Sequence, residues 1–519
     1  MSDGMLRSRL DSERMVMLGL GAVVLIVGML TVTPWPVGAF QDDAIYTVLA
    51  KSLATGEGFR MINLPGSPNA THYPPGYPLV LAALWKLWPS FPDNIVLFKF
   101  ANTGFLALAA VGTYAFARER WQLSAPQAIV TALVGTISIV VLLLTGVVLS
   151  EPLFMALLMP ALLYSERAVS TGHVRPALIA GLLLGVLAMV RTLGAFAVPV
   201  ACLLLLLRGH WRAMLALGAA AALFLVPWQL WVSAHQGEIA APLVGKYGSY
   251  GDWLVEGYAS GGWAFARDVL VRNARDVDTT LGFMLMPVLA RWPRVVVGIA
   301  ALVFAAAGMK RYGRATPVTL SFLGSYMLVI MLWPFEPNRF IIAIWPLLLP
   351  LLGFGVAACW RLPLATPVAL PWRGAVVAAA LAMSSGYLWY NGTGYHRKWW
   401  AAVQRNAGQR ARPTAEWVAR YTSPNDVLAT EDDLIVYLYT GRRAVPTSTF
   451  RAGERIHPLT DQEDLATVEE IFQAYDPTFY IVGGDQGIRT SQALAQRNPP
   501  VLRLLGRTNH VLIFQRLTQ

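Results

Sequence analysis

Long runs of apolar residues, separated by short polar connections, dominate the chain from about residue 15 to about residue 390. Many runs are about 17 to 25 residues long, which is the length that an α-helix needs to cross the hydrocarbon core of a bilayer. The pattern predicts about eleven membrane-spanning helices. They are expected at residues 15–35, 95–116, 125–145, 152–165, 176–190, 193–207, 213–234, 294–309, 317–333, 340–358 and 374–390.

The pattern changes after about residue 395. From residue 396 to residue 519 polar and charged positions dominate, and no apolar run is long enough to span a membrane. Short helical and strand patterns alternate there, with helices predicted at 413–421 and 465–475 and strands at 427–430, 479–482, 501–505 and 510–515. This alternation predicts a small soluble α/β domain at the C-terminal end of a polytopic α-helical membrane protein.

A glycine-rich stretch, Gly483-Gly484-Asp485-Gln486-Gly487, lies within this predicted domain. It lacks the spacing of a phosphate-binding fingerprint, so we do not expect nucleotide binding. Docking of an acceptor, or stabilisation of the outward loops, is the role that we expect of the domain.

Composition and charge agree with a membrane protein and disfavour a nucleic-acid partner. Of the 519 residues 55% are hydrophobic and 14% are charged, and the mean hydropathy is +0.49. The formal net charge is +11, but the basic residues are scattered singly between apolar runs rather than gathered in a patch. Membrane topology explains such a distribution better than nucleic-acid binding does.

The positions of the basic residues predict the orientation of the chain. The N-terminal tail and alternate connections carry arginines, among them Arg7, Arg118, Arg167, Arg208, Arg311 and Arg361. The positive-inside rule places these connections in the cytoplasm. We therefore expect a cytoplasmic tail at 1–14, a transmembrane domain at 15–395 with outward loops at 36–93 and 233–291, and an extracytoplasmic domain at 396–519.

Two adjacent acids, Asp42 and Asp43, follow the first predicted span directly. Adjacent carboxylates beside a membrane add nothing to stability, so their position favours a chemical role. One of them has an alternative interpretation, as the cap of a short amphipathic helix that is predicted from about Ala44 to Ala54. A rigid turn, Tyr73-Pro-Pro-Gly-Tyr-Pro78, leads into a second surface helix at about 79–88, and the two helices would roof a cavity at the bilayer boundary.

These motifs resemble the bacterial members of the GT-C glycosyltransferase superfamily, close to the family-39-like protein O-mannosyltransferases and the lipid A aminoarabinose transferases. The resemblance covers the transmembrane region and the order of its parts. Those parts are Asp42-Asp43-Ala-Ile-Tyr46, Gly56-x-Gly58, the Tyr-Pro-Pro-Gly-Tyr-Pro turn, Ser150-Glu-Pro-Leu-Phe154, Val190-Arg-Thr-Leu-Gly194 and Pro337-Asn-Arg-Phe340. Aminoarabinose transferases typically have Lys-Pro-Pro where this chain has His72-Tyr-Pro-Pro, which leaves the acceptor open.

The resemblance implies a sugar donor on a polyprenyl phosphate, which is reached from membrane lipid and used on the outer face of the bacterial cytoplasmic membrane. Transfer to an acceptor hydroxyl needs a general base, for which Asp42 and Asp43 are the candidates. The leaving phosphate needs cations, for which we select Arg339 and Arg191, with Lys246 as a weaker candidate. For substrate binding we select Tyr46, His72, Tyr73, Glu151, Tyr247 and Glu336.

Three interpretations stay open for Glu151, which begins a predicted span after Ser150. It could orient one of the arginines, accept a sugar hydroxyl or help to hold a metal. The outward loops contain no Asp-x-Asp motif and no histidine cluster, so we expect no required metal, with a divalent ion as the open alternative.

A transporter or lipid flippase is the rival class, because it would also be polytopic and carry charges near the membrane. Such proteins often show paired repeats and coupling acids inside their spans. This sequence shows neither feature, and its selected acids lie at span ends or in outward loops. The pattern therefore favours an enzyme, whose acceptor could be a protein, lipid A, another lipid or a glycan.

Overall fold

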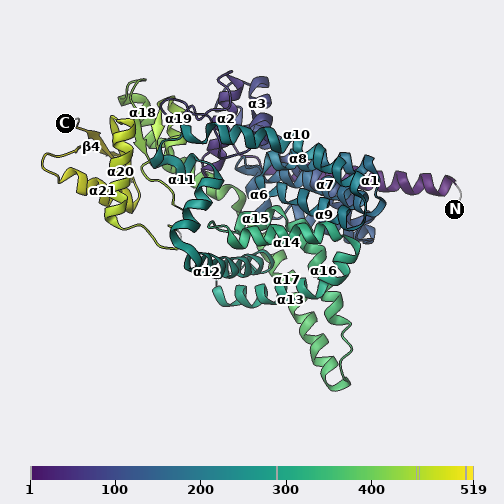
Figure 1. The fold of residues 1–519 in the computed structure, drawn as a ribbon. Helices are drawn as coiled ribbons and strands as arrows, with labels where there is room; N and C mark the ends of the chain where they lie inside the picture. The colour runs from purple at the N-terminus through teal and green to yellow at the C-terminus, as the bar shows by residue number, and fades with distance from the viewer. Residues whose placement is uncertain (1–2, 288–289, 452, 455, 509–510, 518–519) are drawn as a thin grey trace. The chain divides into compact units, whose positions relative to one another are not determined.

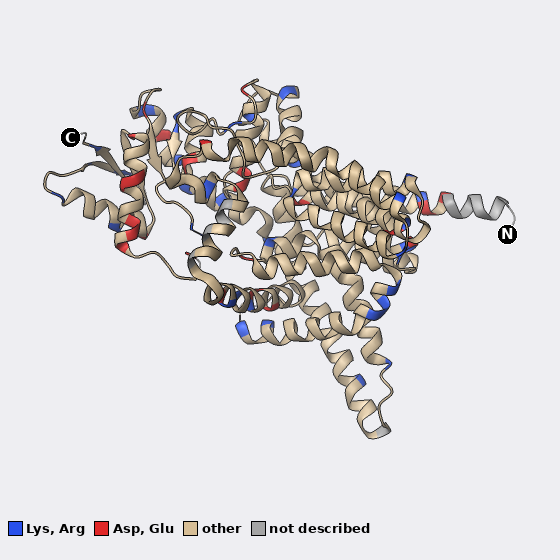
Figure 2. Ribbon diagram, viewed as in Figure 1, with Lys and Arg blue, Asp and Glu red and all other residues tan. Residues whose placement is uncertain are grey.

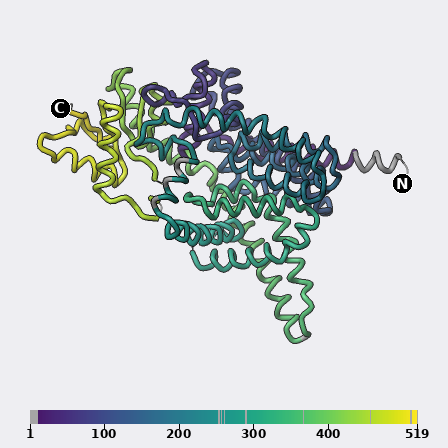
Figure 3. The backbone as a smooth tube through the Cα atoms, in the orientation of Figure 1, coloured from purple at the N-terminus to yellow at the C-terminus, as the bar shows by residue number. Residues whose placement is uncertain are grey.

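The computed structural model describes residues 3–287, 290–451, 453–454, 456–508 and 511–517. The chain forms two compact units, each assembled from three segments (Figure 1). Unit 1 consists of Met1–Thr33, Lys99–Pro227 and Val269–Ala401. Unit 2 consists of Pro34–Phe98, Trp228–Asp268 and Ala402–Gln519, which Figure 3 traces as purple, teal and green-to-yellow segments.

In the described part of unit 1 helices alternate with short connections, and the second half of α12 (Tyr250–Leu285) belongs to this unit as well. Its helices, some of which continue past the bounds of the unit, are α1 (Asp3–Thr31), α4 (Ile95–Glu119), α5 (Ala125–Thr136), α6 (Ile139–Gly146), α7 (Glu151–Thr171), α8 (Val174–Val190), η1 (Thr192–Phe196), α9 (Ala197–Leu207), α10 (Trp211–His235), α13 (Arg291–Ala315), α14 (Pro317–Leu332), α15 (Asn338–Ala343), α16 (Trp345–Trp360), α17 (Thr366–Arg397) and η4 (Trp399–Ala401). A helix therefore lies over each of the eleven predicted ranges.

The number of membrane crossings is a separate question from the number of helices. Among the described residues, six helices are long and apolar enough to cross a membrane, and a seventh span results if α5 and α6, bent by 51°, count as one. Figure 2 shows few charged positions along most helices of unit 1. Eleven crossings stay a prediction, whereas a multi-pass helical architecture is established.

Glycines allow two helices of unit 1 to approach each other closely. A Cβ atom on Gly355 of α16 would lie 1.7 Å from the carbonyl oxygen of Phe304 on α13. A Cβ atom on Gly308 of α13 would lie 2.2 Å from the carbonyl oxygen of Leu351 on α16. Small residues at such a contact let the backbones pack closely, which stabilises helix pairs in membranes.

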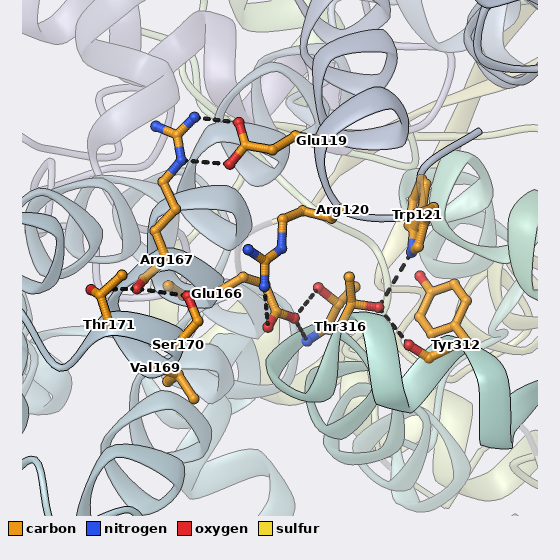
Figure 4. Close-up of polar contacts among 12 residues, drawn as sticks. Glu119, Arg120, Trp121, Glu166, Arg167, Val169, Ser170, Thr171, Tyr312 and Thr316 are labelled. Carbon is orange, nitrogen blue, oxygen red and sulfur yellow. Dashed lines mark hydrogen bonds and ion pairs between the residues drawn. The ribbon is translucent and has the colours of Figure 1, made fainter. Parts of the chain in front are cut away.

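A cluster of ionic contacts joins α4, α7 and α14 within unit 1 (Figure 4). The buried Glu166 carboxylate of α7 accepts hydrogen bonds from the backbone N–H of Thr319, at 2.8 Å, and from its hydroxyl, at 2.9 Å. Arg120 approaches the same carboxylate at 3.9 Å. Since Thr319 lies in the first turn of α14, Glu166 satisfies a helix N-terminus from a neighbouring helix.

The segment 233–291 is largely helical, although the sequence predicts an outward loop there. It contains η2 (Gln236–Glu238), η3 (Ala241–Leu243), α11 (Val244–Tyr247) and the long α12 (Tyr250–Leu285). Gly262 has φ 54° and ψ −146°, so α12 is kinked there. Its glycines and charged residues hide the helical periodicity, although Val269, Val277 and Leu281 are buried at helical spacing.

Unit 2 begins with α2 (Asp42–Ala54) and α3 (Gly76–Leu87), at the positions of the two helices predicted to follow the first span. Nine of the 13 residues of α2 are buried, so it is not the amphipathic surface helix that the sequence predicted. The two helices pack against each other, and Tyr46 of α2 meets Tyr77 of α3 edge to face at 5.1 Å. The C-terminal segment adds α18 (Ala402–Tyr421), β1 (Leu428–Thr430), α19 (Asp433–Thr440), β2 (Ala444–Val445), α20 (Asp461–Tyr475), β3 (Phe479–Val482), α21 (Asp485–Ala495), β4 (Leu502–Thr508) and β5 (Val511–Arg516).

The five strands form one sheet in the order β2-β1-β3-β5-β4. Strand β1 is parallel to both β2 and β3, whereas β5 is antiparallel to β3 and β4. One face of the sheet buries Leu428, Ile481 and Ile513 against Val418 of α18 and Val436 of α19. The predicted α/β fold of the C-terminal segment is confirmed; α19, β2 and α21 were not predicted.

Candidate functional site

The two predicted catalytic acids lie side by side in the first turn of α2 but in different surroundings. Asp43 is fully buried, and its carboxylate accepts the backbone N–H groups of Gly38 at 2.7 Å, Ala39 at 3.1 Å and Phe40 at 3.0 Å. Burial raises the pKa of Asp43 to about 6 although the three hydrogen bonds oppose that shift. The side chain therefore secures the loop that precedes α2, rather than capping the helix itself.

Asp42 is half-buried and pairs with another predicted residue. The hydroxyl of Tyr73 donates a hydrogen bond of 2.8 Å to its Oδ1 atom. Burial, and next the nearby charge of Asp42, raise the pKa of Tyr73 well above its usual value, so the phenol stays protonated and remains a donor. The Tyr73 ring meets Tyr46 edge to face at 5.0 Å. The structure thus brings together Asp42, Tyr46 and Tyr73, which the sequence predicts to belong to one site.

His72 is held beside this group by a residue that the sequence analysis did not select. Its Nδ1 atom lies 2.5 Å from the carbonyl oxygen of Gly248, and its ring lies 4.1 Å from that of Tyr250. Burial lowers the pKa of His72 and favours the neutral imidazole. Because a carbonyl oxygen only accepts, the proton resides on Nδ1, and Nε2 is then an acceptor.

The segment before His72 is anchored by Glu238, an outward acid to which no role was assigned. Its carboxylate accepts the backbone N–H of Asn69 at 2.9 Å and the Asn69 side-chain amide at 2.9 Å. The indole of Trp231 donates to the Ala70 carbonyl at 3.0 Å. No local sequence signal reveals these contacts, since 169 and 161 positions separate the partners along the chain.

Lys246 and Tyr247, the weaker candidates from the sequence, both contact Asp433 of α19. Lys246 Nζ lies 3.1 Å from Oδ1 of Asp433, and the fully buried Tyr247 donates its hydroxyl to Oδ2. Burial raises the pKa of Asp433, while the charge of Lys246 opposes that shift. These contacts tie α11 to α19 within unit 2, and a role for Lys246 in donor binding stays a prediction.

Three predicted residues meet in unit 1. Glu151 is fully buried at the start of α7, and its Oε1 atom lies 2.9 Å from Nη1 of Arg191 and 2.9 Å from Nη2 of Arg339. Arg191 also donates to the Ser150 hydroxyl at 3.2 Å. Two guanidinium groups thus share one carboxylate, and of the three interpretations of Glu151 this geometry corresponds to the orientation of arginines.

Glu336, the remaining substrate-binding candidate, is exposed next to α15. It accepts a hydrogen bond of 3.3 Å from the side-chain amide of Asn338, whose oxygen accepts the Thr280 hydroxyl. Among the residues that the structure describes, no group of three or more His, Cys, Asp or Glu side chains is arranged to hold a metal ion.

Comparison with solved structures identifies the fold. The chain is similar to ArnT from Cupriavidus metallidurans bound to undecaprenyl phosphate, with a TM-score of 0.57 and 14% identity over 97% of this chain and 98% of that chain. The apo state of the same protein gives a TM-score of 0.54 at 14% identity, over 96% and 97% of the respective chains. The sequence matches no protein-family model and no curated protein.

The polytopic helical fold that was predicted from the sequence is therefore confirmed as ArnT-like over almost the whole length of the chain. At 14% identity the likeness establishes the fold and leaves the roles of the site residues to be tested.

Proposed function

We propose that this protein is a glycosyltransferase that moves a sugar from a polyprenyl-phosphate donor to an acceptor hydroxyl on the outer face of the cytoplasmic membrane. The observation that carries the proposal is the half-buried Asp42 carboxylate, held by the Tyr73 hydroxyl at 2.8 Å in a chain of this fold. The solved structure of ArnT with undecaprenyl phosphate supports a polyprenyl phosphate as the carrier of the donor sugar.

Asp42 is the proposed general base. As the acceptor oxygen bonds to the anomeric carbon, its proton passes to the Asp42 carboxylate, and the bond from the anomeric carbon to the phosphate oxygen breaks with its electron pair on the phosphate. Attack from the face opposite the phosphate inverts the anomeric configuration. Tyr73 keeps the carboxylate oriented, and the neutral His72 offers its Nε2 atom as an acceptor to a sugar hydroxyl.

The guanidinium groups of Arg191 and Arg339 are proposed to bind the donor phosphate, on the basis of their chemistry. They remain charged at any physiological pH and can each donate two hydrogen bonds to phosphate oxygens. Glu151 holds both in fixed orientations, which reduces the entropy that is lost when they bind an anion.

The test is turnover of a panel of radiolabelled polyprenyl-phosphate sugars by the purified protein in lipid, with membrane extract as the acceptor source. Native protein is expected to move label to a new product, whereas Asp42→Asn is expected to leave the donor intact. A native protein that is folded but consumes no donor would contradict the proposal and favour transport instead. Equal turnover by the Asp42→Asn variant would remove Asp42 as the base.

A further inference from the structure

A polar cavity of about 360 Å³ lies in the C-terminal α/β part of unit 2, and none of its lining residues has been assigned a role above. Its volume falls in the range of about 300 to 1,000 Å³ that is usual for small-molecule sites. The residues that line it are mostly hydroxyl, amide and carboxyl groups, including Thr447, Ser448, Thr467, Thr490, Gln486 and Asp464.

The cavity occupies the position in the sheet where α/β folds bind ligands. Its walls come from the residues that directly follow three mutually parallel strands, namely Glu431 after β1, Thr447–Thr449 after β2 and Gly484–Gly487 after β3. The chain passes from β1 to β2 on one side and then to β3 on the other, so the strand order reverses between β1 and β3. Ligands in open α/β sheets bind at the carboxyl ends of the strands at such a reversal.

A buried phenol in this cavity lacks a hydrogen-bond partner. Tyr480 of β3 is fully buried and lines the cavity, and its hydroxyl makes no hydrogen bond to any residue that the structure describes. A buried hydroxyl without a partner costs about 1 to 3 kcal/mol. A ligand that accepts a hydrogen bond from Tyr480 would remove that cost, so the free cavity favours a polar occupant.

The charges of the cavity exclude an anionic occupant. Glu431, Asp464 and Asp485 are carboxylates, and none of the described lining residues is Lys, Arg or His. The backbone N–H groups of Gly483 and Gly484, which could otherwise bind a phosphate, already donate to the Glu431 carboxylate at 3.3 and 2.9 Å. A phosphate or carboxylate ligand would therefore meet repulsion from three carboxylates, and no cationic group among the described lining residues offsets that repulsion.

We propose that this cavity is a saccharide-binding site for a neutral or positively charged sugar unit. Sugar hydroxyls donate to carboxylates and accept from Tyr480, which matches the side chains present. The proposal does not depend on the proposed glycosyl transfer, because it rests on a different part of unit 2.

The test uses the full-length protein in nanodiscs and saturation-transfer NMR with three probes, which are methyl α-glucoside, glucosamine and glucuronate. We expect binding of the first two at millimolar concentration and at least tenfold weaker binding of glucuronate. Tyr480→Phe removes only the unpartnered hydroxyl, so it should fold normally and weaken binding about tenfold. The matched control is Tyr439→Phe, which removes another buried hydroxyl with no described partner. Because Tyr439 does not line the cavity, this variant should bind the saccharides like the native protein.

Three results would overturn the proposal: no saturation transfer to methyl α-glucoside or glucosamine, equal binding of glucuronate, or native affinity in Tyr480→Phe. Asp42→Asn should keep native saccharide binding. Loss of donor turnover in that variant with unchanged saccharide binding would show that the two sites are separate. The turnover assay then tests the proposed glycosyl transfer, and the binding assay tests the saccharide site independently.

Discussion

At the scale of single residues, Asp42 and Asp43 show how neighbours in sequence take separate tasks. Successive side chains in a helical turn point in different directions, so one carboxylate faces the loop at Gly38–Phe40 and the other faces Tyr73. The buried Asp43 accepts hydrogen bonds from three backbone donors, and the half-buried Asp42 accepts one from the Tyr73 hydroxyl. This division favours Asp42 as the base and Asp43 as the support.

We expect Asp42→Asn to lower donor turnover about 10²-fold to 10⁴-fold, which is the usual contribution of a general base. Asp43→Asn should retain turnover within about tenfold of the native rate when it is assayed at a temperature where it is folded, because its role is to hold the loop. The measurement is initial rate with saturating donor. Loss of turnover in both variants, with native thermal stability, would show that both acids act in the chemistry.

The raised pKa of Asp43 predicts a pH-dependent stability. Since the folded-state pKa is about 6 against a usual value of 3.8, the folded state binds this proton more tightly. The resulting contribution of Asp43 to the free energy of unfolding is on the order of 3 kcal/mol. This stabilisation is complete below about pH 4 and is lost as the pH rises through about 6. The melting temperature of native protein should fall more steeply between pH 4.5 and 7.5 than that of Asp43→Asn, and equal slopes would contradict the shift.

Sequence patterns identified residue types more readily than residue partners. The acid pair, the Tyr-Pro-Pro turn and the arginines stand out because their positions in an apolar chain are costly without a role. The contact between Tyr73 and Asp42 spans 31 positions and that between Arg339 and Glu151 spans 188, so neither follows from local periodicity. Gly248, Glu238 and Asp433 were not assigned to the site for the same reason.

At the scale of elements, helix ends in unit 1 are held by side chains from other helices. We expect Glu166→Ala to lower the stability by about 2 to 4 kcal/mol, since it leaves buried donors at the start of α14 and the Arg120 charge without their carboxylate. The matched control is Glu119→Ala, which removes an ion pair with Arg167 whose side chains are 38% and 37% exposed. It should cost less than about 1 kcal/mol.

Thermal unfolding of both variants in one detergent provides the measurement. If the melting temperature of Glu119→Ala were as low as that of Glu166→Ala, the buried Glu166 carboxylate would have no special role in stabilising the start of α14.

Element positions in the membrane region were predictable because long apolar runs require helices there. Helix α12 was missed since its first half contains several glycines and its second half carries charged residues between the buried positions. Asn273 in that helix is fully buried and donates to the carbonyl oxygens of Ile330 at 2.9 Å and Trp333 at 2.6 Å. Such a long-range cap for the end of α14 has no signature in the sequence.

At the scale of the whole molecule, the fold that the chain shares with ArnT was predictable from the order of motifs, whereas the assembly of unit 2 was not. The boundary at about residue 395 follows from composition. The joining of the residues after that boundary to 34–98 and 228–268 depends on contacts such as that of Tyr247 with Asp433.

One close contact inside unit 2 gives a direct test of this assembly. A Cβ atom on Gly245 of α11 would lie 1.5 Å from the carbonyl oxygen of Phe450. We expect Gly245→Ala to destabilise unit 2 by about 1 to 3 kcal/mol and to increase cleavage within 402–519 in limited proteolysis. Gly251→Ala, whose nearest neighbour would be Ser249 Oγ at 3.9 Å, is the control and should resist the protease like native protein. Equal resistance of the two variants would contradict the contact.

The three-segment construction of unit 2 has a consequence for biogenesis. Its parts leave the ribosome near the beginning, the middle and the end of synthesis, because they lie at 34–98, 228–268 and 402–519. Pairings between such distant segments form slowly, and incomplete units expose apolar surface while they wait. The helices α2 and α3 therefore remain without their final packing partners until translation of the last segment is complete. Nascent chains of this protein should depend on a holding chaperone throughout that interval.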